Sequence, residues 1–270
     1  MENKAKSGGY ARYMIPYDVV NAWGVAHPWI SREQIEQDML LSRAICDIYS
    51  NNLLSKELVF RGGTALNKLV LPRPYRYSED LDFVRSSAGG IGDIMKELTY
   101  IGKQSGFLVK TKMGIYPKLY WQCVAQTGRI LKIKIEINTY ERNSALPVAE
   151  IEHSVATDWY SCKAIARVFQ NEELAATKIR ALYQRTKGRD LFDLWLLATK
   201  VGLNTEAVLL AFSKYRPDGF TAKNSIDNLE KKLRDVKFVS DINNLLASDG
   251  LVYSIEDAAS YVIEQYLQNL

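Results

Sequence analysis

The segment from residue 60 to residue 84, FRGGTALNKLVLPRPYRYSEDLDFV, constrains the fold most, because it joins a glycine turn, a short helix and a strand that carries two carboxylates. Alternation with a period of two residues places Ser78, Asp80 and Asp82 on one face of the strand, while Leu81 points into a core. Two neighbouring carboxylates repel each other and favour a shared cation. Mg²⁺ or Mn²⁺ suits the pair, because Mg²⁺ is usually bound by one or two carboxylates and by substrate phosphates.

The glycine turn provides groups that suit a phosphate. Gly62 and Gly63 leave backbone N–H groups uncovered at the start of a helix, where anions bind readily. Thr64 adds a hydroxyl, and Lys68 follows on the same helix. A Gly-Gly pair alone is an ordinary turn, and an Asp-x-Asp pair alone is common on exposed strands. Their order, with one helix and a turn between them, predicts nucleotide chemistry.

A second strand, residues 131–138, alternates without interruption between apolar and polar side chains. Glu136 stands on its polar face beside the positive charges of Lys132 and Lys134. Glu136 is therefore a candidate third acidic group. A solvated strand face with ion pairs between strands is the alternative interpretation.

The C-terminal part of the chain carries charged residues where helices should be apolar. Lys178 falls inside the apolar stripe of a helix expected over residues 171–182. A lysine there is costly unless it meets an anion, or unless its stem reaches outward and leaves the ammonium in water.

A second helix, expected over residues 189–197, repeats the anomaly with two carboxylates. Asp190 and Asp193 share one helix face and require a cation if they are buried. Lys178, Lys187 and Arg189 are the expected partners. A purely structural network of salt bridges is the alternative.

The order of the patterns predicts an α+β protein of two lobes. Residues 1–160 should form a lobe with a mixed β-sheet flanked by helices, and residues 161–270 a helical lobe, with a soft boundary between Glu150 and Asn171. Residues 1–30 are expected to be a loosely structured arm that contains Tyr10 and Tyr13. A helix with a capping box should begin at Ser31.

Composition narrows the class of protein. Lys and Arg total 35 against 31 Asp and Glu, and this net charge of +4 permits an RNA or nucleotide partner without requiring one. The 3 cysteines show no Cys-x-x-Cys spacing, which disfavours a zinc site and a disulfide framework. No apolar run reaches the ~18 residues of a membrane span, and no secretory segment is visible. A cytoplasmic protein without a membrane partner is therefore expected.

The motif Gly62-Gly63-Thr64 followed by Asp80-Leu81-Asp82 resembles the signature of DNA polymerase β-like nucleotidyltransferases. Four motifs in this order resemble, more narrowly, the AbiEii family of nucleotidyltransferase toxins, which includes the MenT toxins. They cover residues 62–68, 75–83, 172–178 and 187–194.

The resemblance implies an enzyme that transfers a nucleotide from an NTP, with Mg²⁺, in a toxin–antitoxin or phage-defence setting. It further implies a tRNA acceptor whose 3′ end is extended or blocked, which stops translation, and a cognate antitoxin. Asp80 and Asp82 match the metal ligands, Lys178 the nucleotide-binding lysine, and Asp193 with Asp190 the second essential acid. Glu136 is the candidate for the third carboxylate, which in some relatives takes the proton from the attacking hydroxyl. The remaining residues expected to contact the nucleotide are Gly62, Gly63, Thr64, Lys68, Ser78, Lys187 and Arg189.

Three other functions remain open at this stage. A protein nucleotidyltransferase that modifies a Ser, Thr or Tyr hydroxyl would use the same residues, and so would a kinase that transfers the γ-phosphate. A nucleotide- or RNA-binding module without turnover would not need the costly carboxylates.

Overall fold

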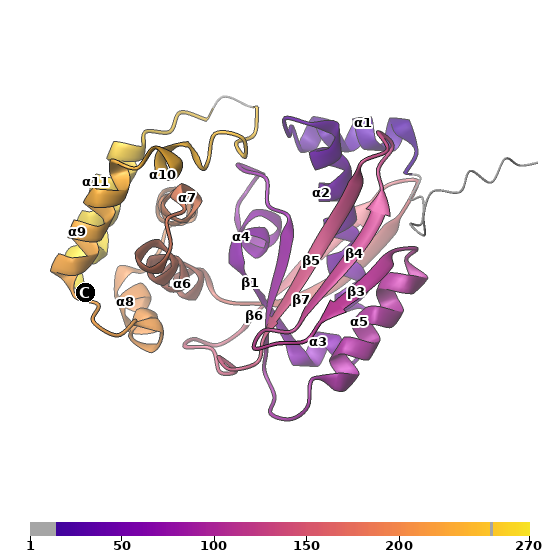
Figure 1. Ribbon diagram of the computed structural model, residues 1–270, viewed down its shortest axis with the longest axis horizontal. Helices are drawn as coiled ribbons and strands as arrows, with labels where there is room; N and C mark the ends of the chain where they lie inside the picture. Colours follow the sequence, from indigo (N-terminus) through magenta and orange to yellow (C-terminus); the bar gives the residue numbers. More distant parts are fainter. Residues whose placement is uncertain (1–14, 249–250) are drawn as a thin grey trace, which may run out of the picture. The chain divides into compact units, whose positions relative to one another are not determined.

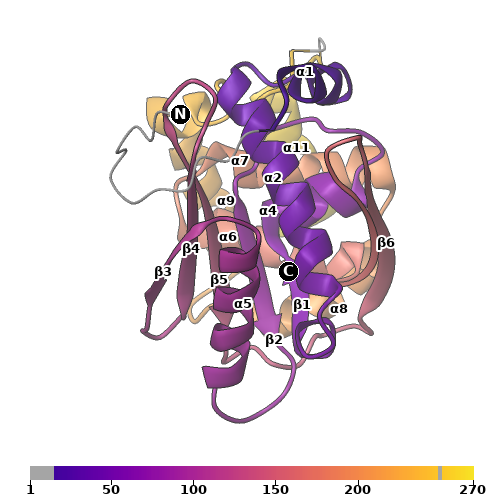
Figure 2. The same cartoon turned by 90° about the vertical axis from the view of Figure 1, so that its right-hand side faces the viewer.

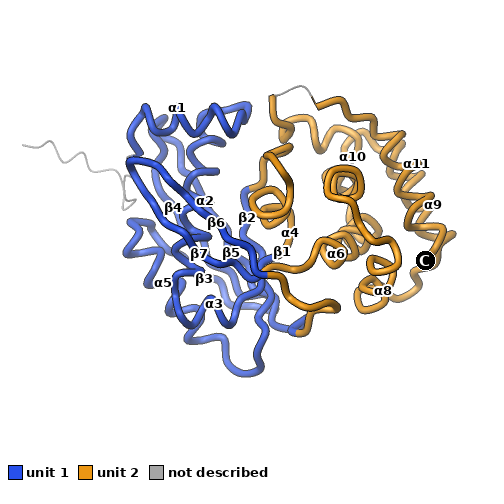
Figure 3. Tube along the Cα trace, turned by 180° about the vertical axis from the view of Figure 1, so that it is seen from behind, with its two compact units in different colours: residues 1–60, 79–142, 150–167 blue, residues 61–78, 143–149, 168–270 orange. Residues whose placement is uncertain are grey.

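The computed structural model describes residues 15–248 and 251–270. The chain forms two compact units, coloured separately in Figure 3. The sheet unit contains residues 1–60, 79–142 and 150–167, and the helical unit contains residues 61–78, 143–149 and 168–270. Each unit is therefore assembled from segments that are separated in the sequence.

The sheet unit is built on one seven-stranded mixed sheet, with the strand order β3-β4-β5-β2-β1-β7-β6 (Figure 1). Strand β2 runs parallel to β5, whereas β4 is antiparallel to both β3 and β5. The strands are β1 (Leu58–Arg61), β2 (Asp80–Arg85), β3 (Leu108–Lys112), β4 (Lys118–Val124), β5 (Ile130–Asn138), β6 (Ala149–Ala156) and β7 (Ser161–Val168). The predicted mixed sheet flanked by helices is confirmed.

Two long helices, α2 (Arg32–Tyr49) and α5 (Gly92–Gln104), pack side by side on one face of this sheet (Figure 2). Apolar side chains of β2, β4 and β5 alternate toward that face, and Phe83 meets the Tyr49 ring of α2 at 6.2 Å between centroids. The short helix α3 (Leu54–Glu57) leads into β1. Because strand side chains alternate, the polar residues of β2 and β5 lie on the opposite face.

The capping box predicted at Ser31 is confirmed at the start of α2. The Ser31 hydroxyl accepts a hydrogen bond from the backbone N–H of Gln34, and the Gln34 side chain accepts one from the N–H of Ser31. These bonds satisfy two donors that a helix start leaves unpaired.

The expectation of a loosely structured arm is wrong for part of residues 1–30. Residues 17–26 form helix α1 (Tyr17–Ala26), although no side chain caps its start. Tertiary contacts stabilise it instead, because Val20 is buried and the Trp23 indole donates a hydrogen bond to Asp38 of α2 at 2.8 Å. Tyr10 and Tyr13 lie outside the described residues.

The helical unit contains the glycine turn and all elements after β7. They are α4 (Gly62–Ala65), the π-helical turn η1 (Leu66–Val70), α6 (Asn171–Gln184), α7 (Gly188–Leu196), the π-helical turn η2 (Leu197–Val201), α8 (Thr205–Tyr215), α9 (Ala222–Leu233), α10 (Val236–Ser240), α11 (Ile255–Gln265) and the 3₁₀ turn η3 (Leu267–Asn269). Helix α6 packs against α7 and α8. Residues 75–77 pair with residues 245–247 through two backbone hydrogen bonds of 2.7 and 3.0 Å.

The units do not divide at residue 160, although the last change of unit lies within the boundary region expected between Glu150 and Asn171. Strand β7 belongs to the sheet, so the helical region begins later, at residue 168. Residues 61–78 and 143–149 also join the helical unit, because their contacts lie mainly with residues far along the chain. A boundary drawn along the sequence cannot represent such an exchange of segments.

Three observations bear on the expected compartment and metal content. Cys46, Cys123 and Cys162 are all free thiols. Within residues 15–248 and 251–270, no three His, Cys, Asp or Glu side chains converge as a closed metal site. Over the same residues, every helix is too short or too polar to span a membrane.

Candidate active site

The sheet unit carries three carboxylates on one polar face, which we call the carboxylate ladder: Asp80 and Asp82 on β2, and Glu136 on β5. The register pairs Asp80 with Lys134 and Asp82 with Glu136, so the third carboxylate stands directly beside the second. Asp80 and Asp82 are half-buried, while Leu81 between them is completely buried. The predicted alternation of β2 is confirmed.

Two lysines lie among these carboxylates. The Lys134 ammonium is 2.7 Å from Asp80 Oδ2 and 3.7 Å from Glu136 Oε2, and the Lys118 ammonium is 2.8 Å from Glu136 Oε2. Partial burial disfavours the charged form of Lys134, but the hydrogen bond and charge of Asp80, aided by Asp82 and Glu136, raise its pKa above the ordinary value. Ion pairs between strands therefore exist, as the alternative interpretation of Glu136 proposed.

The donor set of the ladder fits a hard divalent cation. Asp80 and Asp82 present carboxylate oxygens from alternate positions of one strand, on the same face. Mg²⁺ requires only one or two such ligands when substrate phosphates and water complete its shell. A converging set of three protein ligands is thus unnecessary, and the ladder meets the smaller requirement.

The glycine turn belongs to the helical unit and packs closely on an arginine. Gly62 has a φ of 83°, in the left-handed region that glycine adopts without strain. A Cβ on Gly63 would overlap the Arg76 guanidinium and come within 3.1 Å of the Ser78 hydroxyl. Thr64 Oγ1 donates a hydrogen bond of 2.8 Å to that hydroxyl. Gly63 therefore has a packing role that the sequence did not indicate.

Next to the turn lies a chain of five alternating charges, which we call the buried charge network: Arg76, Asp193, Lys178, Asp190 and, at its solvent-exposed end, Arg185. Arg76 donates two hydrogen bonds to Asp193, of 2.6 and 2.7 Å. The Lys178 ammonium lies between both carboxylates, 2.6 Å from Asp193 and 3.1 Å from Asp190. Arg185 donates two hydrogen bonds to Asp190, of 2.5 and 2.7 Å. The network holds three cations and two anions.

The pKa values follow from this pairing. Burial alone would raise the pKa of Asp190, but the charges and hydrogen bonds of Lys178 and Arg185 outweigh it and lower the pKa to about 2. For Asp193, burial is again opposed, by Arg76 and Lys178, and its pKa lies below the usual range. Both carboxylates are thus charged at neutral pH although neither side chain is exposed.

Some of the expected partners of Asp190 and Asp193 are wrong. Lys187 and Arg189 instead contact Asp241, at 3.3 and 3.9 Å. The proposal that Lys178 extends into water is also wrong, because its side chain is only 7% exposed. The first error arises because other cations, Arg76, Lys178 and Arg185, already occupy the two buried carboxylates.

Sequence reasoning missed the two arginines of the network. Arg76 is 3% exposed and donates hydrogen bonds to Asp193. Arg185 directly follows helix α6 and carries no pattern of its own. Lys68, another residue expected to contact the nucleotide, lies half-buried on η1. The available signal was charge balance, because two buried carboxylates require more cations than Lys178 alone.

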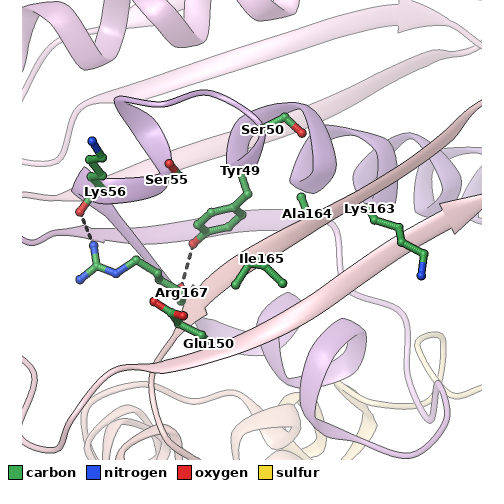
Figure 4. A pocket seen from close by; sticks show the side chains of 9 residues that line it. All are labelled: Tyr49, Ser50, Ser55, Lys56, Glu150, Lys163, Ala164, Ile165 and Arg167. Atoms are coloured by element: carbon green, nitrogen blue, oxygen red, sulfur yellow. Dashed lines mark hydrogen bonds between the residues drawn. The ribbon is translucent and has the colours of Figure 1, made fainter.

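An open pocket of about 710 Å³ in the sheet unit contains none of the expected site residues (Figure 4). Tyr49 and Arg167 line it, with the Tyr49 hydroxyl donating a hydrogen bond of 2.8 Å to the Arg167 carbonyl. The Arg167 guanidinium donates to the Lys56 carbonyl. Its size alone does not make this pocket the reactive centre, since it lacks the paired carboxylates.

We expect Asp193→Asn to destabilise the protein by about 3–5 kcal/mol, because it leaves the buried Arg76 without its anion. Asp241→Asn is the matched control: it also removes a carboxylate that serves two cations, but those cations are 46% and 36% exposed. The control should cost below about 1 kcal/mol. Urea unfolding of both variants measures the difference, and equal losses would contradict the account of the buried charge network.

The pKa of Asp190 also predicts a pH dependence. A carboxyl with a folded pKa of about 2 and an ordinary value of 3.8 contributes stability that is present above the ordinary value and is lost as the pH falls to about 2. The difference in unfolding free energy between the wild type and Asp190→Asn should therefore shrink as the pH falls through this window. Urea titrations at several pH values test this, and a constant difference would show that Asp190 has an ordinary pKa in the folded protein.

Comparisons with known proteins identify the family and the fold of the chain. Residues 43–260 match the family described as "Nucleotidyl transferase AbiEii toxin, Type IV TA system". The fold is similar to that of MenT4, a nucleotidyltransferase toxin from Mycobacterium tuberculosis H37Rv, with a TM-score of 0.63 and 17% identity over 95% of this chain and 91% of that chain. An antigenic nucleotidyltransferase-like protein from Paracoccidioides brasiliensis gives a TM-score of 0.42 and 19% identity, over 71% of this chain and 92% of that chain. No curated protein sequence matches the chain.

The family match covers most of the chain, including both aspartates of β2, the Lys178 helix and the Asp193 helix. The similarity to MenT4 supports the same fold at low sequence identity. The chain therefore belongs to the AbiEii family of nucleotidyltransferase toxins of type IV toxin–antitoxin systems.

Proposed function

We propose that this toxin transfers nucleotides from an NTP, with Mg²⁺ or Mn²⁺, to the 3′ acceptor end of tRNA and thereby blocks translation. The observation that carries the proposal is the register of β2 and β5, which sets Glu136 beside Asp82 and leaves Asp80 and Asp82 on the same polar face. Asp82 and Glu136 stand opposite each other in this register, and like charges in such positions are unfavourable for a purely structural sheet face.

In this proposal Asp80 and Asp82 hold the divalent cation. When bound, the cation neutralises charge on the phosphates and polarises the phosphorus that is attacked. The two aspartates serve this role best as fixed carboxylates on a rigid strand, since a well-placed ligand needs no reorganisation during the reaction. Their half-buried position limits competing water without preventing access.

The chemical step is a displacement at the α-phosphorus. The acceptor hydroxyl oxygen forms a bond to this phosphorus, the bond to the β-phosphate oxygen breaks, and pyrophosphate leaves. Glu136 accepts the hydroxyl proton in our proposal. Its ion pair with Lys118, at 2.8 Å, orients the carboxylate on the polar face, where it can act as a base.

The nucleotide-binding role falls to the glycine turn and the buried charge network. Gly62, Gly63, Thr64 and Ser78 offer backbone N–H groups and linked hydroxyls of a kind that phosphates accept. Lys178 is the residue of this network that matches the nucleotide-binding lysine of the family, and in our proposal it meets a phosphate. In this proposal Asp190 and Asp193 position Lys178, while Lys68, Lys187 and Arg189 supply further cations for the NTP.

The tRNA acceptor and the antitoxin rest on the family rather than on a groove in this chain. A toxin of a type IV system implies an antitoxin, and the net charge of +4 is compatible with RNA. The main competing acceptor is a protein hydroxyl, because the same carboxylates would serve it. The acceptor must therefore be tested directly.

We expect incubation with α-labelled NTP and total tRNA to give labelled tRNA, whereas γ-labelled NTP gives none. Asp80→Ala and Asp82→Ala should each reduce labelling below about a thousandth of the wild-type rate, because each removes a metal ligand and its electrostatic stabilisation. Their melting temperatures should stay near the wild-type value, since one of two repelling carboxylates is lost. Label on lysate protein would favour protein modification, and γ-label transfer would favour a kinase.

A further inference from the structure

Lys134 occupies the part of the carboxylate ladder where a metal ion would meet Asp80. Its ammonium is 2.7 Å from Asp80 Oδ2 and also 3.7 Å from Glu136 Oε2. A divalent cation bound by Asp80 would need an oxygen of this same carboxylate. The structure thus shows a cation of the protein itself where the proposed function requires an external one.

The Lys134 ammonium and a divalent metal ion cannot both bind Asp80 closely at the same time. Both are positive, and they would repel each other across one carboxylate group. Lysine carries its charge on a flexible four-carbon stem, so the ammonium can move while the strand stays in place. The Lys134 side chain is 27% exposed, which leaves the ammonium an open side to move toward.

We propose that Lys134 is a built-in competitor of the metal ion: it neutralises Asp80 while the site is empty, leaves Asp80 when the metal binds, and then contacts a phosphate oxygen of the NTP. The metal alone must draw the ammonium away from Asp80, and it leaves the ammonium with its longer contact to Glu136, at 3.7 Å. Metal that arrives with a triphosphate offers the ammonium a new partner. Lys134 therefore makes metal binding depend on nucleotide binding. This inference rests on the proposed function, because it takes Asp80 as a metal ligand.

Lys118 provides the matched comparison on the same face. It stands on β4, one strand further from β2, and its ammonium pairs with Glu136 at 2.8 Å. Glu136 is not one of the proposed metal ligands. A Lys118 substitution removes the same unit charge from this face but frees no oxygen of Asp80. A specific role for Lys134 thus predicts unequal effects of two otherwise similar substitutions.

The test measures Mn²⁺ binding to the full chain by electron paramagnetic resonance, without nucleotide. We expect Lys134→Met to bind Mn²⁺ about tenfold or more tightly than the wild type, in line with the effect of one nearby charge on an ionic equilibrium. Lys118→Met should show a clearly smaller change, and Lys134→Arg, which keeps the charge, should stay near the wild type. With a non-hydrolysable NTP analogue, Mn²⁺ affinity should increase more in the wild type than in Lys134→Met.

The outcomes separate this inference from the function on which it rests. Unchanged or weaker Mn²⁺ binding by Lys134→Met overturns the competitor role, and so does an equal gain in Lys118→Met. Mn²⁺ binding that survives Asp80→Ala overturns the metal assignment itself, and with it this inference. Melting curves without metal check that each variant is folded, and Lys134→Gln replaces Lys134→Met if the latter is not.

Discussion

The buried carboxylate of Asp193 connects three segments of the helical unit. It is fully buried and binds Arg76 and Lys178, two cations from distant parts of the chain. An unpaired buried carboxylate would be costly, so the segment around Arg76 and helix α6 must both approach α7. Arg76 in turn lies against Gly63, whose missing side chain leaves room for the guanidinium. One buried ion therefore fixes the glycine turn and the lysine that we propose contacts the nucleotide.

The carboxylate ladder of the sheet unit uses charge differently. Its carboxylates are partly exposed, and its cations are lysines rather than arginines. Arginine suits the buried charge network, because its planar guanidinium binds a carboxylate through two hydrogen bonds in a fixed geometry. Lysine suits a site where a metal ion is bound and released, because its ammonium sits on a flexible stem and can move without moving the backbone. In the buried charge network the arginines thus serve the scaffold, and Lys178 is the residue that we propose contacts the nucleotide.

Much of the candidate site is predictable from local sequence, and the remainder depends on topology. Alternation alone places Asp80, Asp82 and Glu136 on polar strand faces, and helical periodicity marks Lys178 as misplaced. Local patterns could not show that β5 lies next to β2, which brings Glu136 beside Asp82. Nor could they pair Arg76 with Asp193, 117 residues away. Lys187 and Arg189 were wrong partners because both contact Asp241, a residue that local patterns did not connect with them.

The central claim is that Asp80 and Asp82 bind the metal ion that serves the nucleotide. Crystals grown with Mn²⁺ and a non-hydrolysable NTP analogue would test it most directly, through the anomalous scattering of manganese. The account predicts an anomalous peak within about 2.3 Å of a carboxylate oxygen of Asp80 and of Asp82, with nucleotide phosphate oxygens completing the shell. A manganese peak beside the nucleotide that contacts neither aspartate would contradict it.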